Sequence, residues 1–213
     1  MNRKVKILGL LVAVFALSGV ATASASAAEY HSEVATTFLQ GNQVTTNVFA
    51  TPAGNVKCKK AEFLGQQSTA TATSLTIEPL YTECTAFGQN AEVTMNGCDY
   101  TFKPLSAASS TVEINCPTGK HITIDVPAGK CEVTVFPTLP TKDTVDTVAG
   151  GSGATRDLTV ESTVEGIEIE PEGTGTICGA TGVKTDKTSY TGTVTLKGFS
   201  NAGHTTQVGI WVQ

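Results

Sequence analysis

Period-two alternation of apolar and polar residues is the feature that most restricts the fold of this chain. It recurs in short segments along the sequence, and no stretch after residue 28 shows helical periodicity over three turns. The predicted strands are residues 44–50, 91–95, 98–102, 111–116, 121–126, 131–136, 157–164, 166–170, 190–199 and 207–212. The pattern therefore predicts an all-β chain.

The turn at residues 96–97 is the strongest hairpin signal, because Asn and Gly both tolerate the positive φ of a two-residue hairpin loop. A hairpin at this turn pairs Met95 with Cys98 and, two residues further out, Val93 with Tyr100. Apolar side chains then fall on one face, and a one-residue slip would turn all of them to solvent. We therefore expect a hairpin whose second strand begins at a cysteine.

The next predicted strand fixes a second register. Pairing Tyr100 with Ile114 also places Cys98 opposite Cys116. In a non-hydrogen-bonded antiparallel pair the Cα atoms lie about 4.5 Å apart, which is within the range that a disulfide permits. The register thus predicts a disulfide between these two cysteines.

All six cysteines follow residue 28, and none forms a Cys-x-x-Cys motif. An even number of cysteines in an exported chain is typical of structural disulfides. The preferred connectivity is Cys98–Cys116, Cys58–Cys84 and Cys131–Cys178. The alternative connectivity joins Cys84 to Cys98 and Cys116 to Cys131, and peptide mapping without reduction distinguishes the two.

These observations together predict an antiparallel β-sandwich or flattened barrel, with disulfides tying strand ends. Residues 29–213 are interpreted as a single all-β domain. The glycine-rich segment at 141–157 is a possible hinge or long loop. A long hairpin or crossover within one domain is the preferred interpretation, because the residues after this segment would form only a thin core alone.

The N-terminus has the pattern of a secretory signal peptide. Three basic residues within the first six precede the apolar run 7–17, and small residues follow as far as Ala28. The apolar run is too short to span a bilayer, and the small residues provide a cleavage region. We predict a signal peptide at residues 1–28, a mature chain without a transmembrane segment, and a secreted protein that could associate with the cell envelope.

The charge of the chain argues against some partners. Removal of the signal peptide takes away three basic residues and changes the net charge from −5 to −8. An acidic surface repels phosphate backbones, so nucleic acid is not an expected partner.

The acidic run at residues 161–172 is the main candidate for chemistry. On a strand, Glu168 and Glu170 share a face opposite Ile167 and Ile169. Two carboxylates on one face could contact a ligand or calcium, or serve a glycosidase. A solvated outer face explains them as well and is the preferred interpretation. The three scattered histidines have no metal-ligand spacing, and no cofactor or catalytic residue is predicted.

The segments VTTNVF, GNVKC, ECTAFGQ, MNGCDYTF and INCPTGK carry a resemblance. The region 44–137 resembles an uncharacterised group of secreted, cysteine-containing all-β proteins of soil actinobacteria. The resemblance implies export and a shared fold, and it assigns no activity and no site residue.

Two functional hypotheses follow. The first is a non-catalytic extracellular or cell-envelope module that binds an unknown ligand or has a structural role, on a scaffold that hosts many functions. The alternative is a secreted, glycan-directed hydrolase that uses carboxylates of the run 161–172. The first hypothesis is preferred, so the chain is not expected to be an enzyme.

Overall fold

The computed structural model describes residues 27–138, 141–143, 148–150 and 156–213. Residues 1–26, which hold almost all of the predicted signal peptide, lie outside this range, as do parts of the predicted hinge or long loop at 141–157. None of the helices in the described residues is long and apolar enough to cross a membrane.

The described residues form strands and two short 3-10 helices, with no α-helix. The first strands are β1 (Tyr30–Ser32), β2 (Thr37–Gln43), β3 (Asn47–Thr51), β4 (Gly54–Gln67), β5 (Thr71–Ala72), β6 (Leu75–Ala86), β7 (Gln89–Thr94), β8 (Asp99–Ser106) and β9 (Ser109–Asn115). The later elements are β10 (Ile122–Val126), η1 (Pro127–Gly129), β11 (Cys131–Val135), β12 (Thr141–Asp143), β13 (Val148–Gly150), β14 (Asp157–Glu165), β15 (Ile169–Gly173), η3 (Thr176–Cys178), β16 (Ser189–Phe199), β17 (Gln207–Val208) and β18 (Ile210–Val212).

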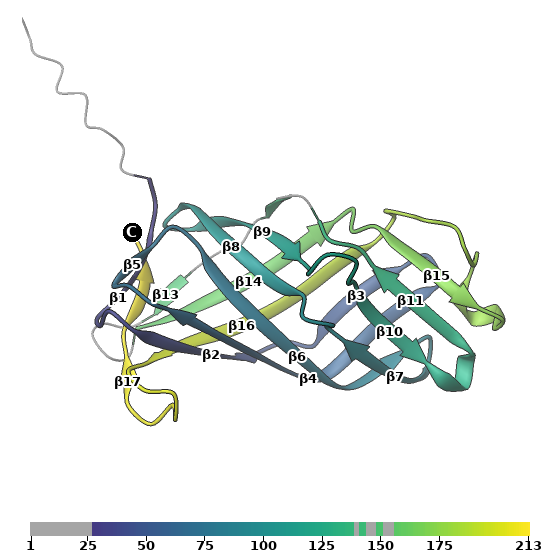
Figure 1. Cartoon of the computed structure of the whole chain (residues 1–213), viewed down its shortest axis with the longest axis horizontal. Coiled ribbons are helices and arrows are strands. Elements are labelled where there is room, and N and C mark those ends of the chain that lie inside the picture. The colour runs from purple at the N-terminus through teal and green to yellow at the C-terminus, as the bar shows by residue number, and fades with distance from the viewer. Residues whose placement is uncertain (1–26, 139–140, 144–147, 151–155) are drawn as a thin grey trace, which may run out of the picture.

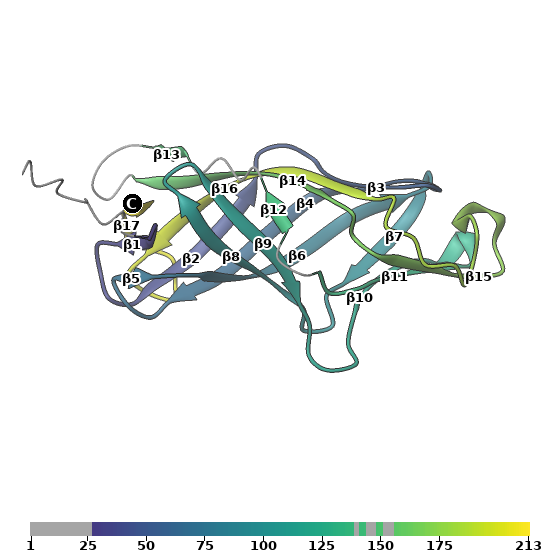
Figure 2. The ribbon, with the colours of Figure 1, turned by 90° about the horizontal axis from the view of Figure 1, so that it is seen from above.

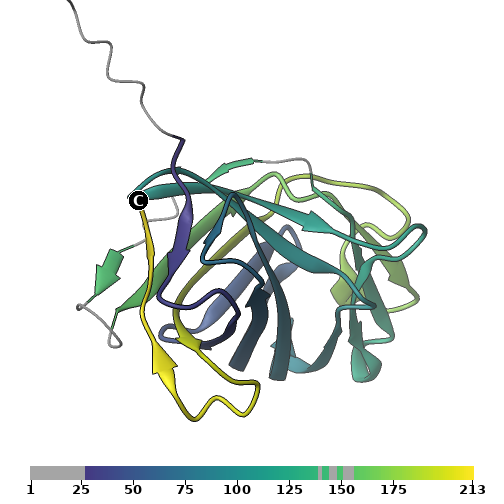
Figure 3. The ribbon, with the colours of Figure 1, turned by 60° about the vertical axis from the view of Figure 1, so that its left-hand side comes forward.

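The described strands form one large antiparallel sheet and one small one. The large sheet runs β13-β14-β16-β2-β4-β6-β7-β10-β11-β15, with further strands attached to it, and the small sheet is β18-β1-β5. The long strands run obliquely along the molecule in Figure 1, and Figure 2 shows β7, β10, β11 and β15 at one end and β1, β5 and β13 at the other. The first and last strands lie side by side, as Figure 3 shows. The predicted antiparallel all-β fold is confirmed, and its shape is consistent with a flattened barrel.

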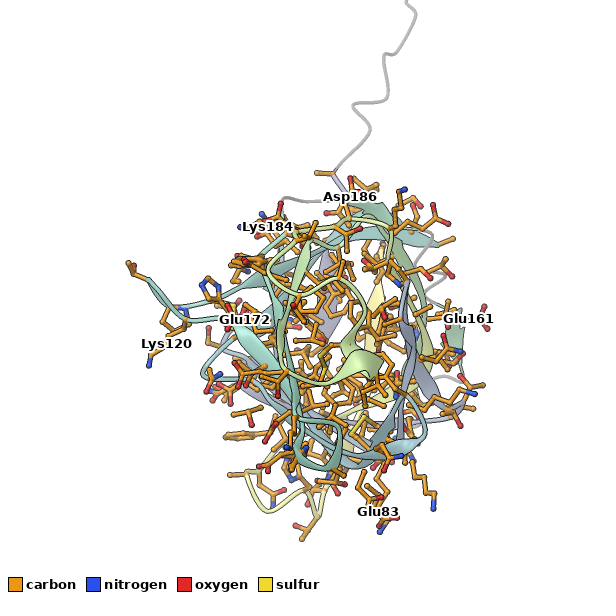
Figure 4. All side chains as sticks on the ribbon, turned by 90° about the vertical axis from the view of Figure 1, so that its right-hand side faces the viewer. Glu83, Lys120, Glu161, Glu172, Lys184 and Asp186 are labelled. Carbon is orange, nitrogen blue, oxygen red and sulfur yellow. A yellow bond between two sulfur atoms is a disulfide. The ribbon has the colours of Figure 1, made fainter. Side chains whose placement is uncertain are left out.

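Alternation along the strands separates an apolar interior from a polar exterior. The buried apolar side chains form two clusters. The first cluster lies on the β7-β10-β11-β15 side and includes Ile124, Val133 and Ile169. The second includes Leu39, Leu158 and Ile210. Seen from the β15 end in Figure 4, carbon-rich side chains fill the interior, whereas charged groups such as Glu83, Lys120 and Glu161 lie at the rim.

The backbone is irregular at one level of the large sheet, where three neighbouring strand positions depart from regular alternation. Strands β2 and β3 both pair with β4 and β16, so they occupy one strand position and are interrupted at residues 44–46. Beside this break, the buried positions of β4 step by three from Cys58 to Ala61, and those of β6 step by three from Tyr81 to Cys84. The pairing register does not shift at this step, since Cys58 lies opposite Cys84 and Lys60 opposite Thr82, and Glu83 has a φ of 52°. We call residues 43–47, 58–61 and 81–84 the waist.

The turn at residues 96–97 is present, but the predicted hairpin is wrong. The Cys98 N–H donates to the Met95 carbonyl at 2.8 Å, which closes a tight turn. Strands β7 and β8 nevertheless run in the same direction, because both are antiparallel to β6. The Asn96 amide donates to the His121 carbonyl at 2.8 Å and so holds the turn against the start of β10. The turn therefore connects two strands that run in the same direction beside β6.

The second predicted register is confirmed. Tyr100 pairs with Ile114, and Phe102 pairs with Val112.

The three disulfides have the preferred connectivity, Cys58–Cys84, Cys98–Cys116 and Cys131–Cys178. Cys98 and Cys116 flank the paired strands β8 and β9, as predicted, with a Cα separation of 4.1 Å. Cys58 and Cys84 depart from the prediction that disulfides tie strand ends, because both lie within long strands, at the waist. Three disulfides fit a protein that works outside the cytoplasm.

Candidate functional site

An apolar cavity of about 120 Å³ lies inside the barrel between the two clusters. Its wall comes from most of the long strands, including β3, β4, β6, β8, β14 and β16. The described residues that line it include no Asp, Glu, Lys, Arg or His. All four tyrosines of the chain are on the wall: Tyr30, Tyr81, Tyr100 and Tyr190. The cavity is therefore uncharged, and hydroxyl groups supply much of its polarity.

The cavity is long and narrow. Alternate residues of β14 line it from Leu158 through Val160 and Ser162 to Val164. Six residue steps along a strand cover about 20 Å. A volume of about 120 Å³ spread over such a length leaves a narrow channel. An extended chain fits this shape better than a compact ring system.

A chain of hydrogen bonds crosses the cavity wall. The Tyr100 and Tyr81 hydroxyl oxygens are 3.1 Å apart, and the Tyr81 hydroxyl donates to the Tyr190 oxygen at 3.3 Å. The Tyr190 hydroxyl in turn donates to Asn47 Oδ1. We call Tyr100, Tyr81, Tyr190 and Asn47 the hydroxyl chain.

The outer end of the hydroxyl chain fixes the direction of its protons. Asn47 Nδ2 donates to Gln43 Oε1 at 2.7 Å, and Gln43 Nε2 donates to the Lys59 carbonyl. A backbone carbonyl can only accept, so Gln43 must direct its NH₂ group outward and its oxygen toward Asn47. Asn47 must then present its own oxygen to Tyr190. One carbonyl at the waist therefore sets the orientation of both amides.

The same constraint passes along the tyrosines. Because Tyr190 donates to Asn47, it accepts from Tyr81, and the single proton of Tyr81 is committed to that bond. Tyr100 must therefore donate to Tyr81. The hydroxyl of Tyr100 retains both lone pairs, and that of Tyr81 retains one. The hydroxyl groups of Tyr100 and Tyr81 can therefore accept a hydrogen bond from a molecule in the cavity but cannot donate one.

The waist is what brings these side chains together. Residues 44–46 leave the strand line, with the Val44 N–H donating to the Thr193 carbonyl at 2.7 Å, so Gln43 and Asn47 come close enough to bond. Asn47 is buried, with 3% of its surface exposed. Its Oδ1 lies against the backbone of Gly192, where a Cβ atom would come within 2.1 Å. The site therefore depends on a break in one strand and a glycine in the next.

Burial keeps the tyrosines neutral. Burial is the main cause that raises the pKa of Tyr81 well above its ordinary value, and the neighbouring Tyr100 and Tyr190 add to it. Burial also raises the pKa of Tyr100 to about 12, although the hydrogen bond with Tyr81 opposes the rise. Both groups are hydroxyls at neutral pH.

The hydroxyl chain lies between the two apolar clusters. Tyr81 belongs to the second cluster, Tyr190 packs against the first, and Tyr100 packs against both. Apolar lining residues continue on either side, toward Leu158 in one direction and Ile167 in the other. The polar groups thus stand near the middle of the channel.

The predicted site residues lie elsewhere. Glu168 is exposed beside the buried Ile167 and Ile169, as expected for an outer face, and it pairs with Lys184 at 2.9 Å. Glu170 lies opposite Thr134 in the β11–β15 pair. Neither carboxylate lines the cavity.

Further exposed carboxylates belong to the same outer face. Four of them lie in register on neighbouring strands: Glu92, Asp125, Glu132 and Glu172. In the part of the chain that the structure describes, no group of three or more His, Cys, Asp or Glu side chains is placed to hold a metal ion.

The histidines share a different environment. Each packs against an aromatic ring, His31 on Trp211, His121 on Phe136 and His204 on Phe199.

Sequence reasoning missed the hydroxyl chain. It interpreted Tyr100 and Tyr190 only as apolar positions of strands, and it placed no strand at Tyr81. One signal was available, since two of the four tyrosines, Tyr100 and Tyr190, lie in predicted strands rather than in turns. Buried tyrosine hydroxyls usually find a partner. That the three partners are each other follows only from the folded structure.

Comparison of the chain with protein-family models, with curated proteins and with solved structures finds no match. The chemistry of the cavity is therefore the basis for a functional conclusion.

Proposed function

We propose that this protein is an exported, non-catalytic binding protein that holds a neutral, mainly apolar small molecule in its interior cavity. The uncharged cavity wall, which holds the hydroxyl chain and few other polar side chains, is the observation that carries the proposal. Binding sites for small molecules are typically apolar hollows with a few well-placed polar groups. The predicted signal peptide and the three disulfides support export.

The size of the cavity supports uptake of an apolar molecule. Engineered apolar cavities of about 150 Å³ stay dry and bind molecules such as benzene. A wall without charged side chains gives no compensation to an ionised ligand, whose burial is costly. The favoured ligand class is therefore neutral.

The cavity is a better-supported site than the acidic run. Glu168 and Glu170 belong to the outer face, where Glu168 is paired with Lys184. A hydrolase that uses this pair would work away from the cavity. We therefore favour binding over glycan hydrolysis.

The test is saturable binding of a neutral, rod-shaped fluorophore, diphenylhexatriene, to the mature protein. We expect one molecule of dye per protein, with enhanced fluorescence. Val160→Trp, on the channel wall, should abolish binding by filling the cavity. Thr163→Trp is the matched control, because Thr163 is exposed on the same strand and should leave binding unchanged.

Near-ultraviolet circular dichroism and the melting temperature check that each variant is folded. If Val160→Trp does not fold, Val194→Phe replaces it, since Val194 faces Val160 across the β14–β16 pair and also lines the cavity. Absence of saturable binding by the unmodified protein would contradict the proposal. So would equal binding by a folded, cavity-filled variant.

A further inference from the structure

We propose, on the basis of the proposed function, that the ligand is an extended aliphatic molecule with a hydroxyl group near its middle. In this complex the ligand hydroxyl donates its proton to the oxygen of Tyr100 or Tyr81. Three properties of the site carry the inference: the direction of the hydroxyl chain, its position in the channel, and the shape of the channel.

The direction of the hydroxyl chain selects a hydrogen-bond donor. Tyr100 donates to Tyr81, and Tyr81 donates to Tyr190, so neither proton is available to a ligand. Reversal of the chain would aim the Gln43 oxygen at the Lys59 carbonyl, which is also an acceptor. At the Tyr100 and Tyr81 oxygens an ester, ketone or ether would therefore meet lone pairs with its own lone pairs. A donor to it would have to be another group of the wall, such as the Ser162 hydroxyl, which also lines the cavity beside Gly192. A ligand hydroxyl can donate to Tyr100 or Tyr81.

The same reasoning disfavours fatty acids. A carboxylate is an acceptor only, so it would face the lone pairs of Tyr100 and Tyr81. It would also carry a charge into a wall whose described residues include no cation. An ordinary anionic lipid head group is therefore the wrong chemistry for this channel.

The position of the hydroxyl chain sets where the donor lies in the ligand. Tyr100 packs against both apolar clusters, and apolar lining residues extend from it in both directions. A ligand with a terminal hydroxyl could reach Tyr100 only by leaving one half of the channel unfilled. Each methylene removed from contact lowers affinity about fourfold, the equivalent of about 0.8 kcal/mol. A hydroxyl in the middle uses both halves.

The experiment compares straight-chain probes of equal length by displacement of diphenylhexatriene. The probes are the alcohol with its hydroxyl on the central carbon, the matching ketone, the alcohol with a terminal hydroxyl, and the fatty acid. We expect the central alcohol to bind about three- to tenfold more tightly than the ketone, as for one net hydrogen bond. The terminal alcohol and the acid should be weaker still. Adamantanol, a compact alcohol, should compete poorly.

Tyr100→Phe tests the assignment of the acceptor. It should reduce the preference for the central alcohol over the ketone to about onefold. Tyr30→Phe is the matched control, because Tyr30 also lines the cavity but lies outside the hydroxyl chain. It should retain the preference.

The outcomes separate the two proposals. If the dye binds in the cavity but the ketone equals or exceeds the alcohol, the inference is wrong and the proposed function stands. A terminal alcohol that binds as well as the central one, or a preference that survives Tyr100→Phe, also overturns the inference. If neither dye nor any probe binds the unmodified protein, the proposed function itself fails.

Discussion

Gly192 is the residue on which the hydroxyl chain most depends. A Cβ atom at this position would lie 2.1 Å from Asn47 Oδ1 and 3.1 Å from the Tyr190 hydroxyl oxygen. Gly192 lies in β16 opposite Ser162, in the middle of the β14–β16 pair. The backbone there is regular, so the need for glycine comes from the space that the Asn47 amide occupies.

Gly192→Ala should therefore destabilise the protein by about 1–3 kcal/mol, as is typical of overpacking. Urea unfolding measures the change. The cost should shrink strongly in an Asn47→Ala background, because the amide that the methyl group meets is gone. An equal cost in both backgrounds would contradict the contact.

The tyrosines predict how stability depends on pH. Burial raises the pKa of Tyr100 to about 12 and that of Tyr81 well above its ordinary value, whereas both titrate near pH 10 in the unfolded chain. Above that pH the unfolded chain binds fewer protons than the folded one, so stability falls as pH rises. The stabilising contribution is complete below about pH 10 and is lost as pH rises through the folded pKa values.

Each buried tyrosine should contribute a slope of about 1.4 kcal/mol per pH unit in this range. We expect Tyr100→Phe to reduce the slope of the unfolding free energy against pH by about 1.4 kcal/mol per pH unit, the contribution of one tyrosine. The slope should change less below about pH 9. Urea titrations between about pH 8 and 11 provide the measurement. An unchanged slope in the variant would show that Tyr100 ionises as freely in the folded state as in the unfolded chain.

At the scale of strands, the change of parity in β4 and β6 explains why these strands were missed from the sequence. The two longest strands, β4 and β6, were not predicted, although the shorter strands β9, β10, β11, β14 and β16 were placed within a few residues. In β4 the buried positions change parity between Cys58 and Ala61, which interrupts the alternation. Strand β6 has the same interruption and also contains Pro79, a residue that disfavours central strands.

The position of Pro79 shows how the strand accommodates it. Strand β6 pairs with β8 only at residues 75–77 and with β7 only at residues 84–86. Between these segments β4 is its only partner among the described strands, and Phe63 lies opposite Pro79. The missing N–H therefore removes no bond from a ladder on the other side. In the sequence Pro79 argues against a strand, but β6 tolerates it because, among the described strands, it has a neighbour on one side only at this point.

The cysteines were the most predictable part of the chain at this scale. Register reasoning linked Cys98 to Cys116 through the Tyr100–Ile114 pair, and the structure contains both. The hairpin predicted from Asn96 and Gly97 failed, because side-chain bonds from Asn96 to β10 decide where the turn lies. Turn chemistry identified the turn but not the direction of the strand that follows.

At the scale of the molecule, the cavity is a cost that the fold retains. By the scaling found for core truncations, an empty cavity of about 120 Å³ costs about 3 kcal/mol. That is a large share of the 5–15 kcal/mol typical of a domain. A bound ligand would offset this cost and stabilise the folded state. The cavity could not be predicted from the sequence, because its lining residues come from strands far apart in the chain and each has the pattern of an ordinary core residue.

The most direct measurement of the central claim is nuclear magnetic resonance of the protein with carbon-13 in its tyrosine rings. With only four tyrosines, single Tyr→Phe variants assign every ring signal. Addition of the central alcohol should shift the signals of Tyr100 and Tyr81 at the carbon that bears the hydroxyl, with a smaller change at Tyr30. The matching ketone should not shift the signals of Tyr100 and Tyr81 in this way. Saturable binding of the alcohol with no change at Tyr100 or Tyr81 would contradict the account.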